Sequence, residues 1–511
     1  MNDRRKSDEP VVPKRSSNER AGRPGREEAA EERGSAKENP HQLPRHRAQD
    51  RTEPKEALRR IREAARSDKG RVFTSLWHHV YNTDRLREAY KATSRSASAG
   101  IDGVTWQEYG LRLEENLTDL SARLRRGAFR AKAVKRAWIP KPDGRKRPIG
   151  VPVLEDKIVQ RSTTEVLSAI YETEFKGFSY GFRPGRGAHM ALDALTVGIE
   201  QKPVRWILDA DIKGFFDAID HDLLLKMIED RICDPRVLRQ LRKWLHAGVM
   251  EDGKLQYAQQ GTPQGGSISP LLANIFLHYV LDVWADSWRA GADGAMIIVR
   301  YADDFVVGFQ HKEDADRFLH DLKERFAAYR LELHPEKTRL IEFGRYARDK
   351  RRQRGEGKPE VFNFLGFTHI CSVTRHGSFK VLRQTQRARL HRSLTRAVTE
   401  LKWRRHWPLE AQGQWLGRVL RGHLQYYAVP GNGPALCGYR NALLRSWYHS
   451  LRSRSGRDRT SWRDIWRYVQ RWLPSVRILH PYPDARFARQ HPRQEPGAVV
   501  PHAGICAGGP G

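Results

Sequence analysis

Residues 297–309 read Ile-Ile-Val-Arg-Tyr-Ala-Asp-Asp-Phe-Val-Val-Gly-Phe, two short apolar runs that meet at a pair of aspartates. The β-branched and aromatic residues on both sides predict a hairpin with Asp303 and Asp304 at its tight turn. Two adjacent carboxylates at a turn either repel each other or share a cation, and a hard divalent ion such as Mg²⁺ suits oxygen donors. Because Asp is common in turns, an ordinary solvated turn is the alternative.

A second pair of acids falls in residues 205–212, Arg-Trp-Ile-Leu-Asp-Ala-Asp-Ile. Side chains two positions apart in a strand share a face, so Asp209 and Asp211 point the same way. Unpaired charge on an otherwise apolar strand is costly to bury. The pair therefore indicates either an edge strand or a strand beside the 297–309 hairpin, where one of the two acids completes a three-carboxylate metal site.

The composition of the chain favours a polyanionic partner. Its 511 residues hold 92 Lys plus Arg against 61 Asp plus Glu, a formal net charge of +31. Four scattered cysteines without metal-ligand spacing argue against a zinc module and suit a reducing cytosol. No run approaches the ~18 apolar residues of a membrane span, and the N-terminus lacks the apolar core of a signal peptide. We therefore expect a cytoplasmic protein with no membrane partner.

Short sequence boxes follow one another in a fixed order around the two acid pairs. They are Ala-Gly-Ile-Asp-Gly-Val (99–104), the Lys- and Arg-rich hairpin sequence at 134–149, Gly-Phe-Arg-Pro-Gly-Arg (181–186), residues 205–216, Gln-Gly-Thr-Pro-Gln-Gly-Gly-Ser (260–267), Tyr-Ala-Asp-Asp (301–304), Leu-Glu-Leu-His-Pro-Glu-Lys-Thr (331–338) and Phe-Asn-Phe-Leu-Gly-Phe (362–367). This order resembles the boxes of reverse transcriptases. The first box resembles the extra N-terminal box of group II intron reverse transcriptases.

The resemblance implies an α+β, right-hand polymerase fold: fingers and palm with an antiparallel sheet, followed by an α-helical thumb or maturase domain. It implies an RNA-directed DNA polymerase that uses two Mg²⁺ ions, with Mn²⁺ as a substitute. Asp211, Asp303 and Asp304 are then the catalytic residues and metal ligands. Asp211 is preferred to Asp209 because the ligand in the family precedes an aromatic residue by five positions, where Phe216 stands.

The resemblance also assigns the site of the incoming deoxynucleoside triphosphate. Lys135, Lys141 and Arg147 fall on the basic positions of the first finger box, and cations on a stiff hairpin suit phosphate groups. Gln264 is the nucleotide-contacting Gln of the Pro-Gln-Gly box. Phe216 is the expected steric gate, whose ring excludes a ribose 2′ hydroxyl. By composition alone, the basic hairpin is equally well explained as a surface turn with solvated charges.

The C-terminal third is both basic and aromatic, with 22 Arg plus Lys against five acids in residues 383–489. Its leucines recur at helical spacing, which predicts a small helical domain with an Arg-rich outside that suits RNA backbone and bases. The position resembles domain X of group II intron proteins, which binds intron RNA. The candidate RNA-binding residues are Arg389, Arg392, Arg396, Arg404 and Arg405. The alternative is that most of the tryptophans are core residues.

The expected domains are a disordered charged tail (1–65), a helical extension of the fingers (66–125), fingers and palm (126–370), the thumb and maturase domain (383–490) and a flexible tail (491–511). The sequence has neither the Cys pairs nor the HNH pattern of the endonuclease that some members of this family carry, so target-site cleavage is not expected. We expect the reverse transcriptase and maturase of a group II intron, acting in splicing and mobility. Its expected partners are that intron RNA, an RNA template, a DNA primer and deoxynucleoside triphosphates. The sequence leaves open whether it forms a homodimer.

Two alternative functions remain from the sequence. One is a reverse transcriptase recruited to other work, such as phage defence or CRISPR spacer acquisition. The other is an RNA-binding splicing cofactor without synthesis, which would be expected if the catalytic aspartates were lost.

Overall fold

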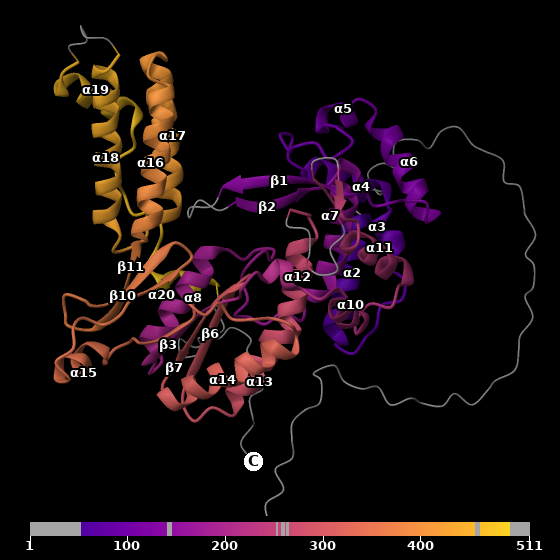
Figure 1. Cartoon of the computed structure of the whole chain (residues 1–511), viewed down its shortest axis with the longest axis horizontal. Coiled ribbons are helices and arrows are strands. Elements are labelled where there is room, and N and C mark those ends of the chain that lie inside the picture. The colour runs from indigo at the N-terminus through magenta and orange to yellow at the C-terminus, as the bar shows by residue number, and fades with distance from the viewer. Residues whose placement is uncertain are drawn as a thin grey trace, which may run out of the picture. The chain divides into compact units, whose positions relative to one another are not determined.

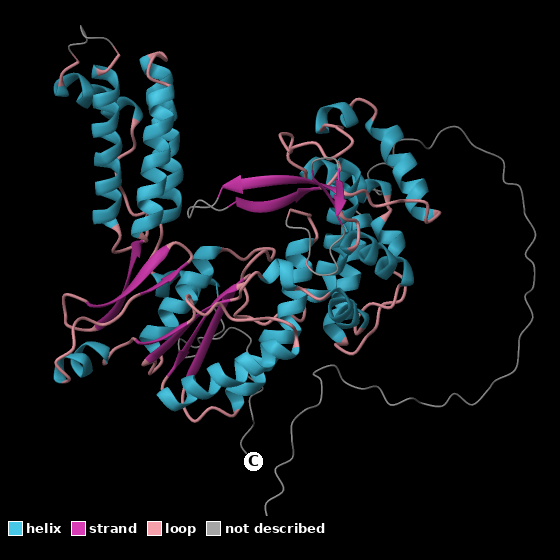
Figure 2. Cartoon of the chain, viewed as in Figure 1, coloured by secondary structure: helices cyan, strands magenta, loops and turns pink. Residues whose placement is uncertain are grey.

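The structure, a computed structural model, describes residues 53–140, 146–251, 254–256, 261, 265–454 and 460–490. The predicted tails at 1–52 and 491–511, as well as Lys141 and Gln264, lie outside these residues. The chain divides into two compact units. Of the described residues, the first holds those within 53–139, 147–175 and 216–284, and the second holds 140, 146, 176–215 and those from 285 to 490. Figure 1 labels the elements, and Figure 2 distinguishes helices from strands.

Helices dominate the first unit. They are α2 (Glu53–Ser67), α3 (Trp77–Val80), α4 (Thr83–Ala92), α5 (Trp106–Gly110), α6 (Leu113–Arg125), α7 (Leu154–Tyr171), α9 (Phe215–Ala218), α10 (His221–Glu229), α11 (Pro235–Leu245), α12 (Ser269–Leu277) and the π-helix η1 (His278–Asp282). A four-stranded sheet has the order β2-β1-β4-β5, with β1 at Val134–Pro140, β2 at Lys146–Val151, β4 at Val249–Glu251 and β5 at Lys254–Gln256. The neighbouring strands β1 and β2 confirm the predicted basic hairpin.

Helix α2 corrects the predicted boundary of the N-terminal tail. The expectation of disorder up to residue 65 is wrong from residue 53 on, where this helix begins. Ile61 and Ala65 lie one turn apart and are buried. Arg85 donates a hydrogen bond of 2.6 Å to the Pro54 carbonyl. The average composition concealed this narrow apolar stripe, because a helix can pack through a few residues at the right spacing.

The second unit is built on a four-stranded antiparallel sheet in the order β6-β7-β3-β8. The strands are β3 (Trp206–Asp211), β6 (Met296–Tyr301), β7 (Asp304–Phe309) and β8 (Arg339–Glu342). Strands β6 and β7 form the predicted hairpin. Strand β3 pairs with β7 on one side and β8 on the other, so the edge-strand interpretation of its two aspartates is wrong.

Helices cover both faces of this sheet. The further elements of the unit, before its helical bundle, are α8 (Ala188–Gln201), α13 (Val283–Ala290), α14 (Lys312–Ala328), α15 (Ala347–Gln353), β9 (Phe362–Phe364), β10 (Phe367–Val373) and β11 (Phe379–Thr385). Helix α8 packs on the face that carries Ile207 and Val306. Helix α14 packs on the other face, where its Phe326 meets Phe305 edge-on. Figure 1 shows both helices beside the strands. By alternation, the two aspartates of β3 lie on the α8 face.

A three-stranded antiparallel sheet, β11-β10-β9, leads into a helical bundle. The bundle consists of α16 (Arg387–Trp403), α17 (Leu409–Tyr427), α18 (Gly433–Arg452) and α19 (Trp462–Trp472). Its core includes Leu401, Leu420 and Trp447. The exposed tryptophans of this C-terminal region are Trp403, Trp407, Trp462 and Trp466. The tryptophans of this region are therefore divided between core and surface, and the helical domain is present as predicted.

Helix α20 (Pro483–Gln490) corrects the limits of the predicted 383–490 domain, because it packs on α8 instead of on the bundle. The buried carboxylate of Asp193 in α8 accepts hydrogen bonds from Arg383 of β11, at 2.8 Å, and from Arg486 of α20. Phe487 joins the core between α8 and the two sheets. Both ends of the predicted domain are thus anchored outside the bundle. A buried charge needs such partners, since an unpaired one is costly.

Candidate active site

The turn between β6 and β7 is held from two sides. Ala302 adopts a left-handed backbone at φ +59°, which costs a non-glycine residue about 1–2 kcal/mol. Gly181 lies against this turn, since a Cβ there would come within 2.2 Å of the Ala302 nitrogen. The buried guanidinium of Arg300 donates a hydrogen bond of 2.8 Å to the Ala302 carbonyl. These contacts fix the backbone that carries Asp303 and Asp304.

The segment that contains Gly181 runs beside β6. The Tyr180 amide donates to the Arg300 carbonyl at 2.8 Å, and the Arg300 amide donates to the Phe178 carbonyl at 2.9 Å. The Arg183 guanidinium donates to the Ser179 carbonyl at 2.7 Å. The glycine of the 181–186 box therefore has a physical reason, because a side chain there would displace the aspartate turn.

The aspartates of the two sequence motifs meet at one end of the sheet. Asp211 pairs directly with Asp304 across β3 and β7, and Asp209 pairs with Val306. Directly paired residues have Cβ atoms about 4.5–5.5 Å apart on the same face. Asp303 precedes Asp304 in the turn. The structure thus brings together the three aspartates that the sequence singles out, with Asp209 beside them.

Burial and mutual repulsion disfavour the charged forms of two of these acids. Burial, together with the negative charges of the neighbouring aspartates, raises the pKa of Asp304 to about 8, against an opposing effect of Arg389. Burial also raises the pKa of Asp209 to about 6, with a smaller contribution from Asp211. A cation stabilises such a cluster, and a set of carboxylate oxygens suits a hard divalent ion. The residues present therefore fit the divalent metal that reverse transcriptases use.

Two basic side chains lie against the acids of β3. Lys337 donates a hydrogen bond of 2.6 Å from Nζ to Oδ2 of Asp211, and Arg339 lies 3.7 Å from the Asp209 carboxylate. The backbone of this segment is also tied to β3, since the His334 amide donates to the Asp211 carbonyl at 2.7 Å. Among the described residues, the aspartate oxygens are not gathered within 4.8 Å of one another. In this structure the partner of the Asp211 carboxylate is therefore Lys337.

The predicted triphosphate residues are described only in part. Lys135 is exposed on β1, and Arg147 lies in β2. Phe215 is buried and Phe216 is half-buried, so one ring of the pair belongs to the core and the other is accessible. Lys141 and Gln264 lie outside the described residues, as does the side chain of Arg147. All five nucleotide-binding assignments stay predictions.

Gly265, in the glycine-rich sequence at 260–267, packs its backbone against β2. Gly265 has φ +118°, and a Cβ there would come within 2.4 Å of the Gly150 carbonyl oxygen. Both the left-handed backbone and the close approach require glycine. Gly265 thus lies beside the strand that carries Arg147.

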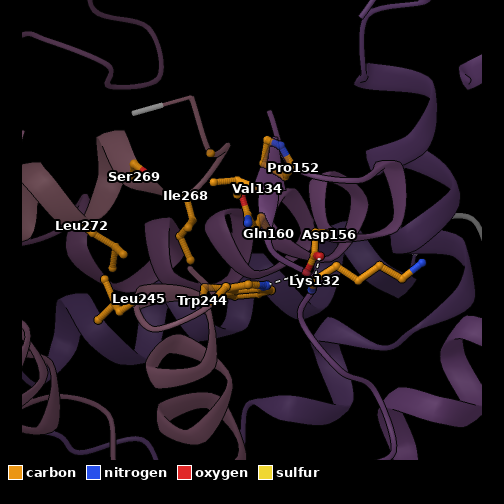
Figure 3. Close-up of a pocket in the computed structure, with 12 residues that line it drawn as sticks. Lys132, Val134, Pro152, Asp156, Gln160, Trp244, Leu245, Ile268, Ser269 and Leu272 are labelled. Atoms are coloured by element: carbon orange, nitrogen blue, oxygen red, sulfur yellow. Dashed lines mark hydrogen bonds between the residues drawn. The ribbon is translucent and has the colours of Figure 1, made fainter. Parts of the chain in front are cut away.

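A small cavity behind this loop is structural. Figure 3 shows Asp156 of α7 between Lys132 and Trp244, and its carboxylate accepts a hydrogen bond from the Lys132 amide at 3.0 Å and from Trp244 Nε1 at 2.8 Å. Burial raises the pKa of Asp156 to about 6. Gln160 Oε1 accepts a hydrogen bond of 2.8 Å from the Ser267 amide. The cavity volume of about 10 Å³ admits about one water molecule, so these residues hold the loop and do not form a substrate site.

The predicted RNA-binding arginines fall into two groups. Three are exposed on α16, namely Arg389, Arg392 and Arg396. Arg404 and Arg405 are half-buried at the end of this helix. Arg404 donates to Glu400 at 2.6 Å and lies over the ring of Trp407. Arg404 is therefore engaged within the protein, whereas the first three are available to a partner.

Sequence reasoning missed the residues that support the aspartates. Arg300 could have been recognised from the sequence, because a charged residue within the apolar run of β6 needs a buried partner. The contact of Gly181 with the turn, the pairing of Lys337 with Asp211 and the pairing of Arg339 with Asp209 had no such signal, since each joins separate segments.

Comparisons with known proteins concern the domain that carries these residues. A family model described as reverse transcriptase (RNA-dependent DNA polymerase) matches residues 139–369. The group II intron-encoded protein LtrA of Lactococcus lactis subsp. cremoris is 36% identical over 222 residues, which cover 43% of this chain and 37% of LtrA. An uncharacterized 91 kDa protein in the cob intron of Schizosaccharomyces pombe is 40% identical over 159 residues, 31% of this chain and 19% of that protein. The chain therefore carries a reverse transcriptase domain and is similar to group II intron-encoded proteins.

The extent of the match differs among the relatives. Protein YkfC of Escherichia coli (strain K12) is 28% identical over 383 residues, which cover 68% of this chain and 96% of YkfC. The matches to LtrA and the fission yeast protein span less than two-fifths of those proteins. The mixed α+β character of the reverse transcriptase domain is confirmed. In the described part of the chain, no helix combines the length and apolar character needed to cross a bilayer.

Proposed function

We propose that this protein is the RNA-directed DNA polymerase of a group II intron, and that it binds the intron RNA and assists its splicing and mobility. The observation that carries the proposal is the direct pairing of Asp211 with Asp304, next to Asp303, within a reverse transcriptase domain. In this proposal the β6-β7-β3-β8 sheet is the palm of a right-hand polymerase. The first unit supplies the fingers, and α16–α19 form the thumb.

The reaction extends a DNA primer on an RNA template. A bond forms between the primer 3′ oxygen and the α-phosphorus of a deoxynucleoside triphosphate, the bond to the β-phosphate breaks, and pyrophosphate leaves. Two Mg²⁺ ions, held by Asp211, Asp303 and Asp304, would lower the pKa of the attacking hydroxyl and stabilise the leaving group, and Mn²⁺ would substitute for them. The protein contributes carboxylates on a rigid sheet and a turn fixed by Gly181 and Arg300.

The remaining nucleotide contacts follow from the sequence assignments. Lys135, Lys141 and Arg147 bind the triphosphate as cations on the β1–β2 hairpin. Gln264 contacts the nucleotide from the position before Gly265, whose backbone packs on β2. The half-buried ring of Phe216 excludes the ribose 2′ hydroxyl, which selects deoxynucleotides.

The bundle supplies the intron-binding surface in this proposal. Arg389, Arg392 and Arg396 present their charges to solvent along α16. Exposed indole rings, such as Trp466 at 52% exposure, offer faces on which unpaired bases stack. A folded RNA with unpaired loops matches a surface that combines cations and exposed rings.

Splicing of the RNA that surrounds this reading frame, at low Mg²⁺, tests the proposal. We expect splicing to be promoted both by the wild type and by a variant with Asp303→Ala and Asp304→Ala, because RNA binding does not need the polymerase site. If neither protein promotes splicing while the wild type extends a primer on RNA, the maturase role is wrong and the recruited reverse transcriptase is supported.

A further inference from the structure

A basic cavity lies at the other end of the catalytic sheet. It has a volume of about 570 Å³ and is bounded on one side by residues 344–352, which include α15, and on the other by the β10–β11 hairpin. Figure 1 shows α15 beside these two strands. Arg205, which precedes β3, contacts the cavity wall through Tyr346. At about 3.3 Å per residue, this end of β3 lies roughly 17 Å from Asp211. The cavity is therefore separate from the acid cluster.

Positive charge is concentrated on the helical wall of this cavity. Residues 345–354 hold six Lys plus Arg against one acid, Asp349. Arg351 and Arg354 form ion pairs with Glu356. Within the described part of the chain, Arg348 and Arg352 enter no ion pair, and both line the cavity. They are four positions apart on α15, so they lie on one face about 6 Å apart along the axis.

An aromatic ring completes this wall. Tyr346 is 45% exposed and lines the cavity. The Arg205 guanidinium lies over its ring at 5.4 Å, which supports the ring in one orientation. Arg345 also lines the cavity and donates a hydrogen bond of 3.1 Å to the Glu200 carbonyl, so a neutral partner fixes its position and leaves its charge uncompensated.

The opposite wall is small and mostly uncharged. It consists of Cys371, Ser372, Val373, Gly377, Ser378 and Phe379. The Gly344 amide donates to Cys371 Sγ at 3.4 Å, which joins the two walls at the floor of the cavity. Burial raises the pKa of the Cys371 thiol to about 11, so the floor carries no negative charge at neutral pH. Three arginines against a single aspartate leave the cavity positive.

We propose that this cavity is a second nucleic-acid site, which binds an unpaired stretch of RNA away from the catalytic centre. One base stacks on Tyr346, and the flanking phosphates pair with Arg348 and Arg352. A base must be unpaired to expose its face to such a ring, which selects a single strand over a duplex. The choice of RNA over DNA rests on the proposed function, in which a folded intron RNA is the large partner.

The test uses the full chain with its catalytic site occupied. The protein is first saturated with an unlabelled primer–template duplex, and a fluorescent ten-nucleotide unstructured RNA is then titrated at several salt concentrations. We expect the Arg348→Ala, Arg352→Ala double variant to lower the slope of log affinity against log salt by about 1.4, since each phosphate contact in a single strand contributes about 0.7. Lys226→Ala with Lys323→Ala, which removes two exposed charges elsewhere, is the matched control.

Changes at Tyr346 separate stacking from charge. Tyr346→Ala should weaken RNA binding roughly fivefold or more, since base–aromatic stacking is worth about 1 kcal/mol at least, and Tyr346→Phe should retain the wild-type affinity. Salt slopes equal to that of the control double variant, or Tyr346→Ala with wild-type affinity, would overturn the proposal. A DNA ten-mer that binds as tightly as the RNA would overturn the choice of RNA.

Primer extension by the same proteins distinguishes the two proposals. All four variants should extend a short primer–template at the wild-type rate, because none of them touches the aspartates. If the cavity variants lose nothing in RNA binding while extension persists, only the second site is wrong. If the wild type does not extend a primer, the proposed polymerase function fails first.

Discussion

The acidic end of the β6-β7-β3-β8 sheet and the basic outside of the α16–α19 bundle place their charges in opposite environments. The aspartates of the sheet are few, close together and partly buried, so burial and repulsion change the pKa of Asp304 and Asp209. The arginines of α16 are spread over an exposed helix. The activity of a clustered site depends on each of its carboxylates. The RNA affinity of a dispersed surface depends on the total number of its positive charges. Substitutions should therefore be severe in the sheet and graded on the bundle.

The largest effect is expected at the turn of the hairpin. Asp303→Ala should reduce DNA synthesis by at least about 10³-fold, because a lost metal ligand removes several kcal/mol of transition-state stabilisation. Binding of structured RNA by the same variant should stay at the wild-type level. Primer extension and a filter-binding assay measure the two quantities. Synthesis near the wild-type rate would remove Asp303 from the metal site.

The pH dependence of metal binding tests whether the buried aspartates differ from exposed charges in their protonation. The pKa of Asp304 is about 8 without metal, so below that pH a proton competes with the ion for this carboxylate. The affinity for Mn²⁺ should fall by about tenfold for each pH unit below 8 and level off above it. Titration of Mn²⁺ by electron paramagnetic resonance measures this. Asp304→Asn should remove the pH dependence, and an unchanged profile in that variant would contradict the assignment.

The choice between deoxynucleotides and ribonucleotides tests whether Phe216 belongs to the same site as the aspartates. Phe216→Ala should raise the relative use of ribonucleotides by roughly tenfold to a hundredfold, because a steric contact with the 2′ hydroxyl is lost. Competition between a deoxynucleotide and the matching ribonucleotide gives the ratio. Since Phe215 is the buried ring of the pair, a Phe215→Leu variant serves as the control for packing. Unchanged selectivity in Phe216→Ala would reject the gate.

The smallest effect is expected on the bundle. Arg392→Ala with Arg396→Ala should leave primer extension unchanged and lower the salt slope of intron RNA binding by about 1.4 to 1.8, two phosphate contacts in single-stranded or duplex-like form. Lys226→Ala with Lys323→Ala again controls for net charge. A slope that matches the control would show that this face of α16 does not carry the RNA.

Local patterns predicted the elements of the site because their signals are short-range. Alternation placed Asp209 and Asp211 on one face, and the apolar runs on both sides of Asp303 defined the hairpin. The contacts that join those elements were out of reach. Lys337 meets Asp211 across 126 positions of sequence, and Gly181 meets Ala302 only because its segment runs beside β6. Contacts between residues so far apart in the sequence form only when the chain folds.

The two boundary errors have similar causes. Helix α2 has a low content of apolar residues, so its average composition resembled that of a disordered segment, although Ile61 and Ala65 are buried. Helix α20 follows the bundle in sequence, yet it is held by Asp193, which lies 293 positions before Arg486. Average composition conceals a narrow apolar stripe, and proximity in sequence does not reveal a buried carboxylate that is paired with arginines from distant segments.

The most direct test of the account compares the two aspartates of β3, which share a strand and a face. Asp211→Asn and Asp209→Asn remove one charge each, two residues apart, and primer extension on an RNA template with Mg²⁺ measures both. The account predicts a loss of at least about 10³-fold for Asp211→Asn, because it is the residue paired with Asp304, and activity close to wild type for Asp209→Asn. An inactive Asp209→Asn together with an active Asp211→Asn would contradict it.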